Sequence, residues 1–151
     1  MHPLLLVLQK GLDGLGLALT PDQQNQLLAY MDLIAKWTKV YNLTAVRDAD
    51  EMLTHHLLDS LAVIAPLRRE LAKLTLPEGV NKYKLLDVGS GAGLPGIVIA
   101  ITCPEALVSC VDTVAKKAAF IRQVAVTLKL PNLKGLHARV ESLAEPFDVV
   151  C

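Results

Sequence analysis

A glycine-rich run follows an apolar segment in the middle of the chain, with the sequence LLDVGSGAGLPG over residues 85–96. The apolar part is typical of a buried strand, and glycines follow it at positions 89, 91, 93 and 96. Glycine at every second position lets the backbone turn sharply and approach a ligand that any Cβ would obstruct. Pro95 suits the first position of a following helix. The run therefore predicts a strand, a turn and a helix that hold a nucleotide-type cofactor.

Apolar segments of strand and helix length alternate along the second half of the chain. We expect strands at residues 84–88, 107–111, 133–138 and 147–151, and helices at residues 94–102 and 114–129. This alternation predicts an α/β fold with parallel βαβ units and helices on both faces of the sheet. The given sequence ends on the fourth strand. Because a buried parallel strand needs a covering crossover, we expect a longer natural protein.

The first half of the chain predicts helices. Thr20 and Gln23 have the spacing of a capping box, and apolar residues then recur at helical spacing. A second helix is expected to start at Asp48. Pro77 and Gly79 then mark a boundary. We expect an N-terminal helical region at residues 1–76 and the first part of a Rossmann-like domain at residues 77–151.

Composition excludes several classes of protein. The 151 residues carry 15 basic and 15 acidic side chains and no charged tail, so polyanion binding would need a local patch. The three cysteines show no metal-type spacing, and His55, His56 and Asp59 lack an evident third ligand partner, so we expect no metal. The apolar run at residues 4–8 is too short for a signal peptide or a membrane span. We therefore expect a soluble, cytoplasmic protein that is a monomer and has no membrane partner.

Two aspartates bear on the choice of cofactor. Asp112 ends the second expected strand, where a carboxylate can accept hydrogen bonds from ribose hydroxyls of either NAD or S-adenosylmethionine (SAM). Asp87 precedes the turn, where it would repel a pyrophosphate and attract the ammonium and sulfonium groups of SAM. Alternatively, Asp87 only accepts a hydrogen bond from the backbone of the turn. The glycine spacing and Asp87 together favour SAM.

These residues resemble a known family. The run from Asp87 to Gly96, with Asp112 after the next strand, is similar to the class I SAM-dependent methyltransferase fold. The longer run DVGSGAGLPGI, the upstream segments YNLTAVRD and HHLLDS, and the later RVE at residues 139–141 resemble the RsmG (GidB) family. The resemblance extends from about Thr20 to Cys151. It implies methyl transfer from SAM to N7 of a guanine in 16S ribosomal RNA, guanine 527 of the small-subunit rRNA, with S-adenosylhomocysteine (SAH) as the product.

The resemblance also implies site residues. Gly89 and Leu94 match positions that contact SAM, and Val140 and Glu141 match positions that contact its adenine. With the glycine loop and the two aspartates, the expected cofactor residues are Asp87, Gly89, Gly91, Gly93, Leu94, Asp112, Val140 and Glu141. A second, polar cluster either braces the helical region or touches RNA: Asn42, Thr44, Arg47, His56, Asp59 and Ser60. An arginine that the family places after the fourth strand lies beyond Cys151.

Alternative functions remain open at the level of sequence. One is an NAD-dependent oxidoreductase, which the glycine spacing and Asp87 disfavour. Another is a non-catalytic SAM-binding or RNA-binding module. Cys151 near the fourth strand suggests a cysteine nucleophile of the kind that pyrimidine methyltransferases use, but the neighbouring proline of those enzymes is absent, and a small hydrophobic role is the alternative. The catalytic residues themselves are not identified from the sequence.

Overall fold

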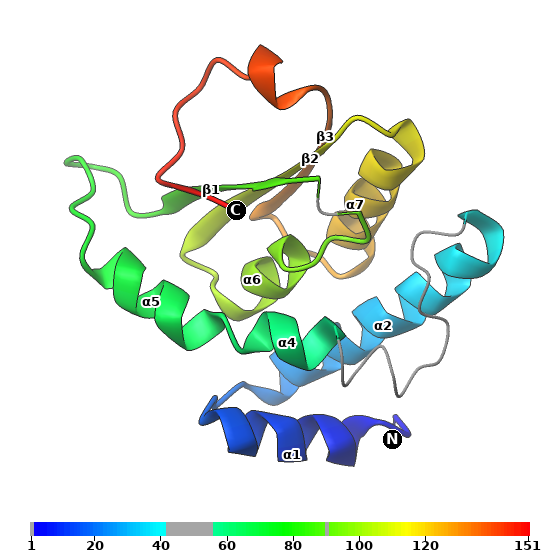
Figure 1. Ribbon diagram of the computed structural model, residues 1–151. Helices are drawn as coiled ribbons and strands as arrows, with labels where there is room; N and C mark the ends of the chain where they lie inside the picture. Colours follow the sequence, from blue (N-terminus) through cyan, green and yellow to red (C-terminus); the bar gives the residue numbers. More distant parts are fainter. Residues whose placement is uncertain (1, 42–55, 90) are drawn as a thin grey trace.

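The structure is a computed structural model that describes residues 2–41, 56–89 and 91–151 (Figure 1). In the first half of the chain it describes the helices α1 (Leu5–Leu15), α2 (Pro21–Tyr41), α4 (Leu58–Leu61) and α5 (Ile64–Ala72). The expected helix start at Asp48 lies outside the described residues. The structure thus describes this second helical segment from His56 onward, as α4 and α5.

Helix α2 begins with the capping box that the sequence predicts. The Thr20 N–H donates to Gln23 Oε1 at 3.0 Å, and the Gln23 N–H donates to Thr20 Oγ1 at 3.1 Å. Each bond satisfies a backbone donor that the first turn of a helix leaves unpaired. Leu27, Met31 and Ile34 are buried along one face of the helix, as their spacing predicts.

Helix α1 lies in the region that is expected to be helical, although no bounds were predicted for a helix over the apolar run near the N-terminus. Its buried residues are Leu8 and Leu12, four positions apart, so that they lie on one face. The helix ends at Gly16, which has a left-handed φ of 68° and donates its N–H to the carbonyl oxygen of Asp13 at 3.1 Å. The helix is therefore held by a narrow buried stripe and a glycine C-cap.

The second half of the chain forms a parallel sheet. Its strands are β1 (Tyr83–Val88), β2 (Ala106–Asp112), β3 (Leu133–His137) and β4 (Val149–Val150), in the order β3-β2-β1-β4. Helix α6 (Gly96–Thr102) connects β1 to β2, and α7 (Ala115–Thr127) connects β2 to β3. The predicted α/β, Rossmann-like class is confirmed. The strand order reverses at β1, which is where such sheets bind ligands.

The two faces of the sheet are covered differently. Helices α6 and α7 lie on one face, together with α2 (Figure 1). The segment after β3, which contains the short 3-10 helix η2 (Val140–Ser142), lies on the other face. Within the described residues no α-helix lies on this second face, so the expectation of helices on both faces is wrong for this part of the chain. The segment between β3 and β4 is an extended connection with a single helical turn.

Helix α6 lies between the sheet and the N-terminal helices. All seven of its residues are buried, as expected for a helix that is apolar all round. Side chains from the first half reach its last turn: Gln23 Nε2 donates to the Ile101 carbonyl at 3.2 Å and Arg68 to the Thr102 carbonyl at 2.8 Å. One cluster of buried residues runs across the expected boundary at residues 76 and 77. The division into two regions stays a prediction.

No helix in the described part of the chain is both long and apolar enough to span a membrane.

Candidate functional site

The glycine loop leaves β1 with its backbone in conformations that favour glycine. Gly89, Gly91 and Gly93 all have positive φ, at 65°, 62° and 97°. The Gly89 N–H donates to the Val111 carbonyl at 2.9 Å, which ties the start of the loop to β2. The Leu94–Pro95 peptide is cis. Pro95 is the N-cap residue of α6 and the helix begins at Gly96, so the expectation of Pro95 as its first residue is wrong.

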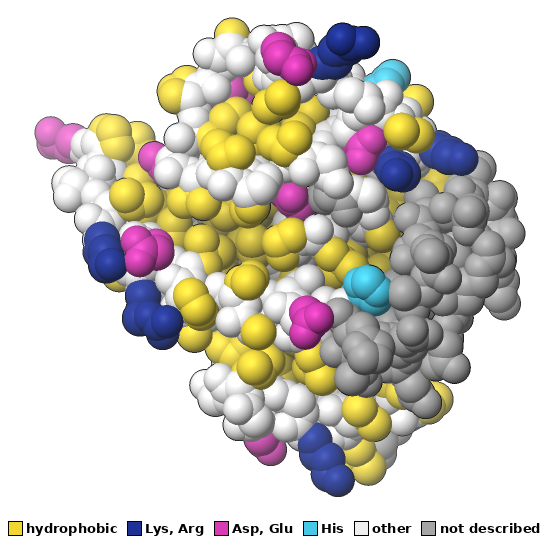
Figure 2. Space-filling view, viewed as in Figure 1, with side chains coloured by type: hydrophobic (Ala, Val, Ile, Leu, Met, Phe, Trp, Pro, Cys, Tyr) yellow, Lys and Arg dark blue, Asp and Glu magenta, His cyan; other side chains and the backbone are white. Residues whose placement is uncertain are grey.

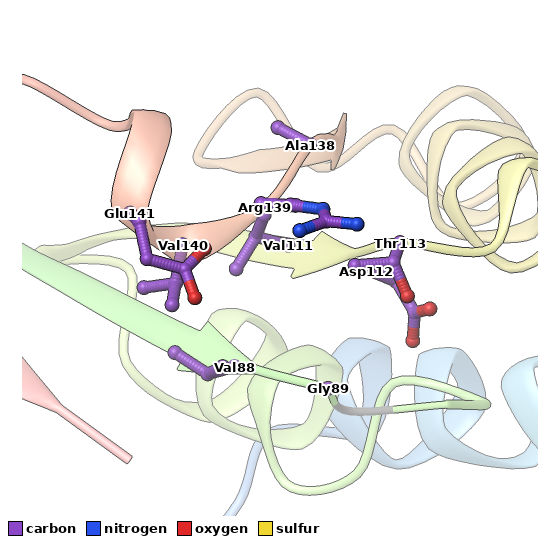
Figure 3. Close-up of a pocket in the computed structure, with 9 residues that line it drawn as sticks. All are labelled: Val88, Gly89, Val111, Asp112, Thr113, Ala138, Arg139, Val140 and Glu141. Atoms are coloured by element: carbon purple, nitrogen blue, oxygen red, sulfur yellow. The ribbon is translucent and has the colours of Figure 1, made fainter.

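A cavity of about 370 Å³ opens at the carboxyl ends of the first three strands (Figure 3). This volume lies within the range of small-molecule sites, about 300–1,000 Å³. Three segments line it: the end of β1, the end of β2 and the connection after β3. The lining residues are Val88, Gly89, Val111, Asp112, Thr113, Ala138, Arg139, Val140 and Glu141.

The cavity brings together half of the expected cofactor residues. Gly89, Asp112, Val140 and Glu141 line it. The Asp112 and Glu141 side chains lie at opposite ends of the cavity in Figure 3. Gly91, Gly93 and Leu94 lie in the adjoining loop and do not line the cavity, and neither does Asp87. Their role in cofactor binding stays a prediction.

Asp112 is held in place by its own backbone. Its Oδ1 accepts a hydrogen bond from the Val114 N–H at 2.9 Å, so the carboxylate closes a short turn at the end of β2. The Asp112 carbonyl accepts from the Ala138 N–H at 3.1 Å, which fixes the spacing of the two cavity walls. The carboxylate is thus preorganised at the mouth, where it can accept hydrogen bonds from hydroxyl groups of a ligand.

Asp87 is buried beneath the loop, with only 3% of its surface exposed. Its Oδ2 accepts a hydrogen bond from the Gly96 N–H at 2.8 Å, at the first residue of α6. Burial raises the pKa of Asp87 from 3.8 to about 6, and the hydrogen bond from Gly96 opposes this shift. The backbone contact that the alternative interpretation describes is therefore present. The attraction between the Asp87 carboxylate and a positively charged group of a ligand stays a prediction.

Sequence reasoning did not assign most of the apolar walls of the cavity. Arg139, its cation, was quoted in the RVE run but was not proposed as a cofactor-binding residue. Val88 stands in the glycine-loop run and Val111 next to the end of β2, but neither was proposed as a site residue. Arg139 lies between Ala138 and Val140 in the lining, and its guanidinium is drawn in Figure 3 on the side of Asp112 and Thr113. On the face shown in Figure 2, Lys and Arg side chains are scattered around the edge while hydrophobic side chains fill the middle.

The expected polar cluster is described only in part. Asn42, Thr44 and Arg47 lie outside the described residues. His56 is half-buried, Asp59 is exposed and Ser60 is buried, all in or just before α4. Among the residues that the structure describes, no group of three or more His, Cys, Asp or Glu side chains is placed to hold a metal ion.

Cys151 does not have the environment of an activated thiol. Partial desolvation and the negative charge of Asp87 raise the pKa of the Cys151 thiol, whereas a nucleophile needs a lowered one. The side chain is exposed here, at the last residue of the given sequence, and a role as a buried small hydrophobe stays a prediction. We expect Cys151→Ser to keep full methyl transfer, measured with labelled SAM. A loss of transfer greater than about 100-fold would instead assign Cys151 a covalent role.

The site belongs to a chain with clear relatives. The profile of the GidB family, described as rRNA small subunit methyltransferase G, matches residues 23–151. The chain belongs to the GidB family. The resemblance inferred from the glycine loop and the upstream motifs is therefore confirmed, and with it the class I methyltransferase fold.

Two GidB-family relatives illustrate the level of similarity. The ribosomal RNA small subunit methyltransferase G of Polaromonas sp. (strain JS666 / ATCC BAA-500) is 67% identical over 144 residues, covering 95% of this chain and 62% of the relative. The protein of the same name from Albidiferax ferrireducens is 65% identical, covering 100% of this chain and 69% of the relative. The chain thus spans somewhat less than two thirds of the length of the first of these relatives.

A solved structure also aligns with the GidB-family chain. It is coclaurine N-methyltransferase bound to N-methylheliamine and SAH, with a TM-score of 0.48 and 15% sequence identity, covering 97% of this chain and 47% of that one.

Proposed function

We propose that this protein is a SAM-dependent methyltransferase that modifies N7 of a guanine in 16S ribosomal RNA. The observation that carries the proposal is the cavity at the carboxyl ends of β1, β2 and β3, next to a glycine loop, in a chain of the GidB family. SAM and the small ribosomal subunit are then the cofactor and partner. A cytoplasmic location and a monomeric state belong to the same proposal.

The residues present fit the proposed cofactor. A Cβ at Gly93 would overlap the Ile97 side chain, so the close packing of the loop on α6 requires glycine at this position. Asp112 would hold the ribose hydroxyls, and Val140 and Glu141 would hold the adenine. Gly89, Gly91, Gly93 and Leu94 would border the methionine part, with the buried charge of Asp87 beneath them. SAM, when bound, supplies an electrophilic methyl group on a positively charged sulfur.

The proposed reaction makes modest demands on the protein. N7 of guanine carries a lone pair and no proton, so no general base is needed to expose the nucleophile. The residues of the chain need only bind both partners and align them, and exclude water from the contact. Asn42, Thr44, Arg47, His56, Asp59 and Ser60 are proposed to lie on the substrate side, either touching RNA or bracing the helices.

The decisive experiment measures transfer of labelled methyl groups from SAM to small-subunit RNA. Free 16S rRNA and small ribosomal subunits are assayed separately, and the modified base is mapped. The proposal requires label in a single guanine that becomes sensitive to the chemistry of N7-methylguanine. Label on another base would contradict guanine N7 as the methylated atom. Binding of NADH rather than SAH in a thermal-shift assay would contradict the methyltransferase proposal and favour an NAD-dependent oxidoreductase.

Asp112 gives a direct test of the cofactor site. We expect Asp112→Ala to weaken SAH binding about tenfold or more, because it removes a charged acceptor of ribose hydrogen bonds. Isothermal titration of SAH into wild type and variant measures this. Asp13→Ala serves as the control, since it removes an exposed aspartate of α1, far along the chain from the cavity. Equal SAH affinity in Asp112→Ala and wild type would place the ribose elsewhere.

A further inference from the structure

The hydroxyl group of Tyr30 joins the N-terminal helices to the glycine loop. Tyr30 lies near the middle of α2 and is fully buried, and its Oη donates a hydrogen bond to the Ala92 carbonyl oxygen at 2.6 Å. Ala92 is itself buried and stands between Gly91 and Gly93. A side chain 62 positions earlier in the chain thus contacts the centre of the loop.

The hydroxyl is suited to a permanent donor role. Burial raises the pKa of Tyr30 well above its ordinary value, and the nearby Cys110 and Asp87 raise it further. The proton therefore stays on Oη at neutral pH. A buried carbonyl oxygen that lost its donor would carry a large desolvation penalty. The contact with Tyr30 thus favours the observed orientation of the Ala92 peptide over others.

That orientation controls the backbone on the opposite side of the peptide. A trans peptide is planar, with its carbonyl and its N–H pointing in opposite directions. With the Ala92 carbonyl directed at α2, the Gly93 N–H is directed away from α2. Without Tyr30 Oη, the flanking glycines would allow this peptide to rotate, because glycine accepts conformations that other residues resist.

Hydrogen bonds hold the described part of the loop at its start, its centre and its end, and the Gly93 carbonyl also accepts from the Ile97 N–H of α6 at 2.7 Å. The Gly89 N–H bonds to β2 at its start, and the Gly96 N–H bonds to Asp87 at its end. The bond from Tyr30 is at the centre and, unlike these others, comes from outside the sheet and its crossover helices. The first half of the chain is therefore linked directly to the conformation of the loop.

We propose that Tyr30 is a positioning residue for the methyl donor, whose hydroxyl holds the Gly91–Gly93 backbone in the conformation that binds the methionine part. The inference rests on the proposed function, in which this loop borders SAM. The helical region is then part of the cofactor site, although Tyr30 does not line the cavity. Loss of the hydroxyl lowers the fraction of molecules with a competent loop, and the apparent dissociation constant rises in inverse proportion to that fraction.

The test compares Tyr30→Phe with a matched variant of the same helix. Tyr30→Phe keeps the buried ring, and α2 keeps its other contacts, such as the edge-to-face packing of Trp37 on Phe120. Gln26→Met is the control, because Gln26 Nε2 also donates from α2 to a backbone carbonyl, that of Leu128 at the end of α7. SAH binding is measured by titration calorimetry, and thermal midpoints are measured in parallel.

We expect SAH to bind about tenfold more weakly to Tyr30→Phe, as for a hydrogen bond whose loss leaves a buried acceptor unpaired. Gln26→Met should bind as wild type does. We also expect faster hydrogen exchange at Gly93 in Tyr30→Phe without SAH, and protection restored when SAH saturates the site.

A second variant separates the donor from the ring. p-Aminophenylalanine at position 30 keeps an N–H donor, and it should restore most of the lost affinity. A lowered thermal midpoint with unchanged SAH affinity in Tyr30→Phe would overturn the inference and leave Tyr30 as a packing residue. Failure of the p-amino variant to bind better than Tyr30→Phe would overturn it too. Absence of SAH binding in wild type would instead contradict the proposed function.

Discussion

Asp87→Asn is expected to abolish a pH dependence of stability worth about 3 kcal/mol, because the carboxyl group of Asp87 has a pKa of about 6 in the folded protein against 3.8 ordinarily. Between these two values the folded state binds more protons than the unfolded state. Stability therefore falls as the pH rises through this window, and the loss is complete above pH 6. Asparagine has no charge to bury, and its side-chain oxygen still accepts from the Gly96 N–H.

Urea unfolding of both proteins between pH 4 and pH 8 measures this effect. The difference in unfolding free energy between wild type and Asp87→Asn isolates Asp87, since the other titrating groups contribute equally to both. We expect the unfolding free energy of the variant, relative to that of wild type, to rise with pH up to about pH 6. Above that pH the two curves should run parallel. Parallel curves over the whole range would mean that the carboxyl group is not desolvated as its burial indicates.

Asp87→Asn is expected to stabilise the fold at neutral pH but to weaken the binding of SAM. A buried carboxylate near the loop is costly in the free protein, and a bound cation would offset that cost. We expect Asp87→Asn to weaken SAM binding about tenfold or more at pH 7.5, and SAH binding less, because SAH lacks the sulfonium charge. Wild-type affinity for SAM should likewise fall as the pH drops through 6. Unchanged SAM affinity in Asp87→Asn would leave Asp87 with only its contact to Gly96.

The local features of the fold could be predicted from the sequence because short-range rules decide them. The capping box at Thr20 and Gln23 depends on two residues three positions apart, and the structure confirms both of its hydrogen bonds. The strand–loop–helix unit depends on a run of apolar residues and on glycines. The ends of the strands shifted by only one or two residues, with β4 shorter than expected at Val149–Val150.

The features that the sequence did not reveal depend on contacts between distant segments. Nothing near Tyr30 indicates that its hydroxyl meets Ala92, and the apolar spacing of α2 only predicts that Tyr30 could be buried. Helix α6 begins at Gly96, one position after the expected first residue, because Pro95, with a ψ of 0°, stands outside the helix as its N-cap residue. Helix α1 is held by packing of Leu8 and Leu12, which the sequence does not specify.

The candidate site divides in the same way. Asp112 could be placed because the carboxyl ends of parallel strands always meet at one edge of the sheet. Glu141 was predicted only through the family resemblance, since a lone carboxylate after a strand is usually solvated. Val88 and Arg139 stand in the quoted runs, but their place in the lining could not be predicted, because the cavity forms only when the ends of β1 and β3 come together.

Gly96→Ala is expected to destabilise the protein by about 3 kcal/mol, the cost of overpacking a core together with the loss of a buried hydrogen bond. A Cβ on Gly96 would lie 2.5 Å from Cys110 Sγ and 2.6 Å from Asp87 Oδ2. Both groups are buried on strands of the sheet, so neither can move aside cheaply. The methyl group would push Asp87 from the Gly96 N–H, and the start of α6 would shift with it.

Gly14→Ala is the matched control for this prediction, because a Cβ on Gly14 meets nothing within 4 Å and Gly14 lies within α1. Alanine there should stabilise the protein by about 0.5–1 kcal/mol through helix propensity. Calorimetric midpoints should therefore move in opposite directions, down by about 10 °C for Gly96→Ala and slightly up for Gly14→Ala. SAH binding should weaken only in Gly96→Ala, since the displaced carboxylate lies under the loop. If both variants gained stability, the packing of α6 on β1 and β2 would be looser than the structure shows, and Asp87 would be free to turn toward the cofactor.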